Sequence, residues 1–291
     1  MKQQVNGATV SEIQAHYDLS NAFYALWLDQ HLIYSAALWD ASQAEQTLEQ
    51  AQMAKLDYHL RQLRCEQAEH VLEIGCGWGA GLQAFLRFSQ IQSVVGLTLS
   101  QAQQTYIEQW ALPRASVALI SWADYLPAQP LDAILSIGAF EHFARPGLSS
   151  AEKQAIYTRF FQTCSDWLKP GGRLALQTIA YGAVEPALQA KISELNQGVF
   201  PGSELPVLRE VLAAAEPSLE LIQLRNDRLD YAKTCQHWRS RLRAAKTRIE
   251  TEYCPEWYKA YQHYLIGAET GFRLGHLHLY RISFEKPKQK F

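Results

Sequence analysis

Short apolar runs alternate with segments of helical periodicity along most of the chain. The first run, residues 70–74, leads into a loop with three glycines, after which Leu82, Phe85 and Leu86 have helical spacing. Further apolar runs predict strands at 93–97, 116–122, 131–137 and 173–179, and helical spacing predicts helices at 100–110 and 150–168. This alternation indicates right-handed crossovers and a mostly parallel, doubly wound α/β sheet covered on both faces.

The chain on either side of this core has a different pattern. Residues 42–64 predict a lead-in helix, with Ser42 and Glu45 at capping-box spacing. Residues 181–206 contain three prolines and three glycines, and we expect a lid insertion over about 180–206. Later elements are expected as helices at 207–215, 234–250 and 256–270 and strands at 219–225 and 277–284. We therefore expect one structural domain, with a helical cap over 1–66 and a core over 67–291.

Composition places the chain among folded proteins of the cytoplasm. Of its 291 residues 48% are hydrophobic and 19% charged, which is typical of globular domains. The five cysteines are odd in number and lack the spacing of zinc ligands, so we expect a reducing compartment and no metal. Neither a signal peptide nor an apolar stretch long enough to span a bilayer is apparent.

The charge pattern argues against nucleic acid as a partner, because the net charge is -2. Residues 225–248 are nevertheless basic, with eight lysines and arginines against two acids. This segment could contact an anionic membrane or a phosphorylated carrier, or it could be a solvated helix face, which is the more ordinary interpretation.

The glycine loop is the first candidate for chemistry. Glu73-Ile-Gly-Cys-Gly-Trp-Gly79 follows the first strand, where a doubly wound sheet binds nucleotides, although a tight turn could also require these glycines. The second strand ends in Gly96-Leu-Thr-Leu-Ser-Gln-Ala-Gln103, without the acid that dehydrogenases use to bind ribose. The sequence therefore disfavours a dinucleotide and leaves ribose contacts to Thr98 and Gln103.

Several further motifs occur in a recognisable order. They are His16–Tyr24, Leu28-Asp29, Tyr34-Ser35, Val71–Ala80, Val95–Ser100 and Ser136–Phe143. With these motifs the chain resembles the cyclopropane fatty acid and mycolic acid synthase family from Gln14 to the terminal strand. The resemblance implies a class I, Rossmann-like methyltransferase fold with seven strands and S-adenosylmethionine as cofactor. It also implies a cofactor site formed by Tyr34, Ser35, Glu73, Gly75, Gly77, Gly79, Thr98, Gln103 and Trp122.

The resemblance further implies a reaction in which an alkene attacks the sulfonium methyl group and the resulting carbocation loses a proton as a ring closes. Bicarbonate is thought to act as base in the family, and its ligands would include Glu141 and Tyr231. At three other pocket positions this chain has Ala36, Gln177 and Ala268, where the family usually has cysteine, histidine and cysteine. Gln177 can donate a hydrogen bond but cannot carry a proton as imidazole can.

Glu141 and His142 follow the fourth strand, at the edge where ligands bind. Glu141 could orient a base, stabilise a cation or accept a proton, or it could be an acid at a helix start. His142 could be a second base or a packed ring. We therefore expect methyl transfer to the alkene of a lipid-like or natural-product substrate. The alternative is a small-molecule N- or C-methyltransferase without ring formation; an inactive nucleotide-binding scaffold is a remote third possibility.

Overall fold

The fold is a doubly wound sheet of seven strands, seen in a computed structural model that describes residues 21–288. The strands are β1 (His70–Ile74), β2 (Ser93–Thr98), β3 (Ala115–Leu119), β4 (Leu131–Ile137), β5 (Leu168–Tyr181), β6 (Glu220–Asn226) and β7 (Leu277–Glu285). Their order is β3-β2-β1-β4-β5-β7-β6, with β7 antiparallel to both of its neighbours. The strand order reverses between β1 and β4, so a ligand site is expected at the carboxyl ends of these two strands.

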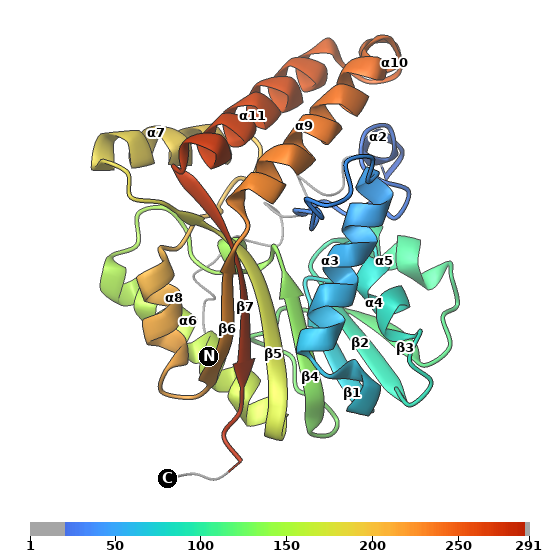
Figure 1. Ribbon diagram of the computed structural model, residues 1–291, viewed down its shortest axis with the longest axis vertical. Helices are drawn as coiled ribbons and strands as arrows, with labels where there is room; N and C mark the ends of the chain where they lie inside the picture. The colour runs from blue at the N-terminus through green and yellow to red at the C-terminus, as the bar shows by residue number, and fades with distance from the viewer. Residues whose placement is uncertain (1–20, 289–291) are drawn as a thin grey trace.

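Helices cover both faces of the sheet (Figure 1). They are α2 (Asn21–Ala25), α3 (Leu48–Gln62), α4 (Ala80–Phe85), α5 (Gln101–Glu108), α6 (Ser150–Trp167), α7 (Pro186–Gln197), α8 (Leu208–Ala215), α9 (Arg228–Ala244), α10 (Lys246–Glu252) and α11 (Pro255–Leu274), with short 3-10 helices at Cys65–Gln67 and Phe140–His142. One apolar core lies between the sheet and α3, α4 and α5, and a second lies under α6 and α8. The predicted α/β class is confirmed.

A third core, rich in aromatic side chains, forms at one end of the sheet. Figure 1 shows α7, α9, α10 and α11 gathered above the end at which the parallel strands finish. Beneath α9 and α11 the ring of Trp27 lies 6.0 Å from that of Trp238 and 5.5 Å from that of Tyr261. The carboxyl ends of the strands are therefore covered by packed aromatic rings.

The lead-in helix begins later than the sequence predicted. Thr47 and Gln50 form the capping box of α3: the Thr47 hydroxyl accepts from the Gln50 amide at 3.2 Å, and the Gln50 side chain accepts from the Thr47 amide at 2.9 Å. Ser42 instead donates to Asp40 at 2.7 Å within a turn. Ser42 with Glu45 and Thr47 with Gln50 both have capping-box spacing, and only Thr47 caps the helix.

The 180–206 segment is more regular than predicted, because α7 occupies its middle. Pro186 lies in the first turn of α7, where a fixed φ and a missing N–H favour a helix start. Residues 1–20, which hold the first part of the predicted cap and of the His16–Tyr24 motif, lie outside the described residues.

Three other boundaries were predicted wrongly. The strand predicted at 173–179 begins earlier, because residues 169–172 belong to β5, where the Gly171 amide donates to the Lys286 carbonyl at 2.9 Å. The helix expected at 234–250 is divided at Ala245 into α9 and α10. The third strand ends at Leu119, so Trp122 lies in the loop that follows it.

Candidate functional site

The loop after β1 requires its glycines. Gly75, Gly77 and Gly79 have φ values of +78°, +51° and +84°, a region that other residues rarely adopt. A Cβ on Gly75 would lie 2.5 Å from the Cβ of Ala139, whereas one on Gly77 would meet nothing within 4 Å. The Gly77 backbone therefore faces open space that a ligand can enter.

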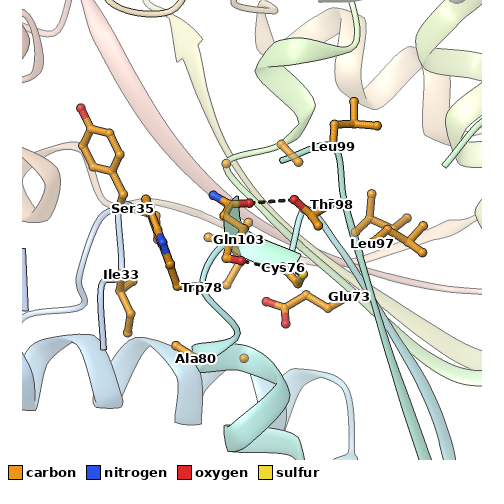
Figure 2. Close-up of a pocket in the computed structure, with 18 of the residues that line it drawn as sticks. Ile33, Ser35, Glu73, Cys76, Trp78, Ala80, Leu97, Thr98, Leu99 and Gln103 are labelled. Atoms are coloured by element: carbon orange, nitrogen blue, oxygen red, sulfur yellow. Dashed lines mark hydrogen bonds between the residues drawn. The ribbon is translucent and has the colours of Figure 1, made fainter. Parts of the chain in front are cut away.

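This space is a cavity of about 170 Å³ between the glycine loop, the start of α5 and the 33–35 segment (Figure 2). Predicted cofactor residues that line it are Tyr34, Ser35, Glu73, Gly75, Gly77, Thr98, Gln103 and Trp122. Gly79 does not line it: this residue precedes α4 and packs against Ile107 and Trp110. Eight of the nine predicted cofactor residues thus meet at one cavity.

The two neutral groups expected to bind a ribose are bonded to each other. The Thr98 hydroxyl donates to the Gln103 side-chain oxygen at 2.7 Å, and both residues are buried. Ser100 caps α5 by accepting from the Gln103 amide at 3.2 Å. The cap fixes Gln103 beside Thr98, so this side of the cavity offers neutral hydrogen-bonding groups.

Glu73 is a buried carboxyl beneath the glycine loop. Burial raises its pKa to about 8, although nearby Lys55 and a hydrogen bond from the Leu82 amide lower it in part. A Cβ on Gly81 would lie 2.2 Å from the Glu73 Oε1. Glu73 therefore packs directly against the backbone of α4.

Because of this contact, we expect Gly81→Ala to reduce the free energy of unfolding by about 1–3 kcal/mol, the usual effect of overpacking. Alanine would otherwise stabilise a helix by up to about 1 kcal/mol, so the clash must outweigh helix propensity. Urea denaturation measures the change. Gly198→Ala is the control, since a Cβ there would approach only the Leu195 carbonyl, at 3.4 Å. Equal stability of both variants would show that the Glu73 side chain can move away from a Cβ at position 81 without a cost in free energy.

A second, smaller cavity of about 40 Å³ adjoins the first. Tyr34, Ser35, Gly138 and His142 line both cavities. The other predicted catalytic residues, Glu141, Gln177 and Tyr231, line the smaller one. All four predicted catalytic residues, which come from the loop after β4, from β5 and from α9, therefore converge on one pocket.

Glu141 is buried and His142 is partly buried, with opposite consequences for charge. Burial raises the pKa of Glu141 to about 7, and the Ile179 amide, which donates to Oε1 at 2.6 Å, lowers it in part. Burial also lowers the pKa of His142 to about 4. At neutral pH the imidazole is uncharged, and the carboxyl is poised to gain or lose a proton.

The raised pKa of Glu141 has a consequence for stability. Between about pH 4.5 and 7 the folded protein keeps a proton that the unfolded chain releases, so this group lowers stability as the pH rises. Glu141→Gln removes this loss, and its stability relative to the wild type should increase by up to about 3 kcal/mol over that range. Urea denaturation at pH 4.5 and 8 tests this, and the His142 contribution cancels because both proteins have it. A constant difference would contradict the burial effect.

The amide of Gln177 is held in one orientation from behind the pocket. Its Oε1 accepts from the Arg281 Nε at 2.9 Å and lies 3.3 Å from the His59 Nε2. Arg281 is fully buried, pairs with Asp227 and donates to the Ala37 carbonyl at 2.8 Å. Because these partners engage the Gln177 oxygen, the amide nitrogen is the group that remains to donate a hydrogen bond toward the pocket. It lies 3.5 Å from the Ala36 carbonyl.

The other departures from the family pattern contribute little to the pocket. Ala36 offers its backbone carbonyl to Gln177, and Ala268 lines neither cavity. Tyr231 stacks on Phe272 at a centroid distance of 4.4 Å, which fixes its ring at the pocket wall. Bicarbonate binding at this pocket stays a prediction.

Several residues at the two cavities were not predicted from the sequence. They are Lys55, Asn196, Phe200 and Tyr264 in the linings and His59 and Arg281 behind them. Gln52, Lys55 and His59 had a usable signal, because they form a polar stripe at helical spacing on the buried face of α3. No local pattern distinguishes Phe200 or Tyr264.

Five of the eight basic residues in 225–248 form ion pairs. Ion pairs or other contacts are made by Arg225 (Asp227), Arg228 (the Phe272 and Arg273 carbonyls), Lys233 (the Trp39 ring), Arg239 (Glu269), Arg241 (Glu49), Lys246 (Glu250) and Arg248 (Glu252). Only Arg243 has no such partner within residues 21–288. Among residues 21–288, no helix has the length and apolar character needed to cross a bilayer.

Comparison with known proteins identifies the family. The sequence profile of the mycolic acid cyclopropane synthetase family matches residues 4–282. The chain belongs to this family. The S-adenosylmethionine-dependent methyltransferase UmaA of Mycobacterium tuberculosis is 34% identical over 282 residues, covering 91% of this chain and 93% of that protein.

Solved structures of family members agree with the fold. The cyclopropane synthase MmaA2 from Mycobacterium tuberculosis has a TM-score of 0.86 at 29% identity, over 96% of this chain and 99% of that one. The mycolic acid cyclopropane synthase CmaA1, complexed with SAH and CTAB, also has a TM-score of 0.86, at 30% identity and the same coverage. These matches confirm the family resemblance, the class I methyltransferase fold and the expectation of an S-adenosylmethionine-dependent enzyme.

Proposed function

We propose that this protein transfers the methyl group of S-adenosylmethionine to the alkene of a lipid-like or natural-product substrate. The observation that carries the proposal is the junction of the two cavities. A cavity suited to the cofactor meets a pocket that holds Glu141, Gln177 and Tyr231, and His142 lines both. The similarity to the methyltransferase UmaA and to the cyclopropane synthases MmaA2 and CmaA1 supports this class of reaction.

The larger cavity has the groups that such a cofactor requires. The open space at Gly77 admits a ligand against the loop backbone, and Thr98 with Gln103 suits ribose hydroxyls. Apolar side chains, among them Leu97 and Trp122, suit the adenine ring. When bound there, the cofactor supplies an electrophilic methyl group and leaves as a thioether.

The residues of the smaller pocket would then handle the acceptor and its proton. Attack by the alkene leaves a carbocation, which loses a proton to give a ring or a methyl branch. Glu141 is the candidate base, because its pKa of about 7 lets it accept a proton at neutral pH. His142 could relay the proton, and the Gln177 amide could orient an oxygen-bearing group but cannot take up the proton itself.

A specific observation also favours methylation of an amine. The smaller pocket has only about 40 Å³ of space, and its walls include four aromatic rings, those of Tyr34, Phe200, Tyr231 and Tyr264. Aromatic faces beside the Glu141 carboxyl would stabilise the positive charge that develops on nitrogen as a neutral amine takes up the methyl group. An amine attacks the methyl group directly and needs one base, so an amine acceptor is the second candidate.

Contact of residues 225–248 with an anionic membrane that delivers the acceptor is a further part of the proposal. With most of these basic side chains paired, binding to vesicles of anionic lipid should be modest and should disappear at physiological salt. Co-sedimentation with such vesicles at low and physiological salt measures this contact.

The acceptor class can be decided by mass spectrometry. The purified protein is incubated with methyl-labelled S-adenosylmethionine and a panel of unsaturated lipids and amines. Label in a lipid, as a branch or a ring, supports the leading proposal, and label on nitrogen supports the second. Absence of transfer to every member of a broad panel, despite cofactor binding, would contradict both. Glu141→Gln is the matched control for uncatalysed transfer.

A further inference from the structure

Lys55 lies on α3 with its side chain buried against the cofactor cavity; it is 1% exposed. Its Nζ donates to the Ser35 Oγ at 2.8 Å. Among the described residues that line this cavity, Lys55 is the only lysine or arginine. The cavity therefore has one basic amine, at the end where Ser35 lies in Figure 2.

The two acids nearest to Lys55, Asp29 and Glu73, make their contacts with other groups. Asp29 accepts from the Ile33 amide at 2.7 Å and from the His31 amide at 3.1 Å, and Glu73 is held against α4. Within residues 21–288 neither carboxylate forms an ion pair with Lys55. Burial of an ammonium group without a counter-ion is unfavourable unless a ligand supplies the charge.

The partner of Lys55 is also fixed in place by α3. Gln52, on the same helix face, donates to the Ser35 carbonyl at 2.9 Å. One face of α3 therefore positions both the backbone and the hydroxyl of Ser35. The ammonium and the hydroxyl together form a preorganised pair of donors at the cavity wall.

We propose that Lys55 and Ser35 bind the carboxylate at the amino-acid end of the cofactor. This inference rests on the proposed function, since it takes S-adenosylmethionine or its product as the ligand. Both ligands carry one carboxylate, and Lys55 is the buried cation that faces their cavity. Lys55 thus selects ligands that keep the amino-acid end over those that have only the nucleoside.

The test compares two ligands that differ in this end. S-adenosylhomocysteine has the carboxylate, and 5′-methylthioadenosine lacks the whole amino-acid part. In calorimetric titrations Lys55→Met should weaken S-adenosylhomocysteine binding by about tenfold to a hundredfold, the usual effect of losing a buried charged hydrogen bond. Binding of 5′-methylthioadenosine should change by less than about twofold. Lys246→Met, at a half-exposed lysine in an ion pair with Glu250, is the charge-matched control.

Proton uptake gives an independent readout. Burial lowers the pKa of Lys55 to about 7, and Arg281 lowers it further, while Asp29 and Glu73 raise it in part; His59 also faces it. A bound carboxylate favours the charged ammonium, so S-adenosylhomocysteine binding at pH 8 should take up a proton. Titration in buffers of different ionisation enthalpy should show this uptake in the wild type and its loss in Lys55→Met.

The outcomes separate this inference from the proposed function. If Lys55→Met binds S-adenosylhomocysteine as tightly as the wild type, the assignment of Lys55 is wrong and the function stands. If both ligands are weakened equally, Lys55 supports the fold only, and the assignment is again wrong. If the wild type binds neither ligand, the proposed function itself fails.

Discussion

Replacing Gly77 with aspartate should weaken S-adenosylhomocysteine binding by at least about a hundredfold while the protein stays folded. A Cβ at Gly77 meets nothing within 4 Å because it points into the cavity that the ligand needs. The substitution places both bulk and a buried negative charge there. Calorimetry measures the affinity, and circular dichroism establishes that the variant is folded.

Gly147→Asp is a matched control for this change. Gly147 also has a left-handed backbone, with φ of +88°, and a Cβ on it would also meet nothing within 4 Å. It is exposed and lines neither cavity. Backbone strain is therefore comparable in the two variants, and only Gly77→Asp should lose the ligand. Equal affinities in both variants would place the cofactor elsewhere.

Glu141→Gln should lower turnover by roughly a hundredfold or more and change cofactor binding by no more than a few fold. Glutamine keeps the size of the side chain and an oxygen that can accept from the Ile179 amide, but it cannot accept a proton. A loss confined to kcat would assign the effect to the transition state. Steady-state kinetics on the acceptor found by labelling, together with calorimetry of the cofactor, separates these quantities.

The pH profile provides a second test of the same group. If the carboxylate is the base, turnover of the wild type should rise with pH through about 7, the pKa of Glu141, and this rise should be absent in Glu141→Gln. Glu204→Gln is the control: this buried carboxyl lies beside Lys153 and lines neither cavity. A variant at Glu141 that retains turnover and the pH dependence would exclude Glu141 as the base.

The position of the site could be predicted because it depends on local patterns. Apolar strands and glycine spacing place the loop after β1, and the topology of a doubly wound sheet places Thr98 and Glu141 at the same edge. Each of these residues ends or follows a strand, so alternation along the sequence was enough to bring them together. The start of α3 was less predictable, because two capping signals precede it. The helix α7 was not predicted, because the prolines and glycines of 181–206 indicated an irregular segment.

The support behind the pocket could not be predicted, because it depends on contacts between distant segments. Arg281 lies in an apolar strand, and its partners Gln177 and Asp227 are 104 and 54 residues away. Phe200 reaches Tyr264 only because the 180–206 segment folds over α11, with ring centroids 5.4 Å apart. Periodicity describes which face of an element is buried, but it does not identify the element that covers it.

The central claim is that a cofactor in the larger cavity presents its reacting end to the smaller pocket. A crystal structure with S-adenosylhomocysteine tests this most directly. We expect the sulfur at the junction lined by Tyr34, Gly138 and His142, with the adenosine beside Thr98 and Gln103. A ligand bound outside the larger cavity, or one whose sulfur faces away from the pocket that holds Glu141, would contradict the account.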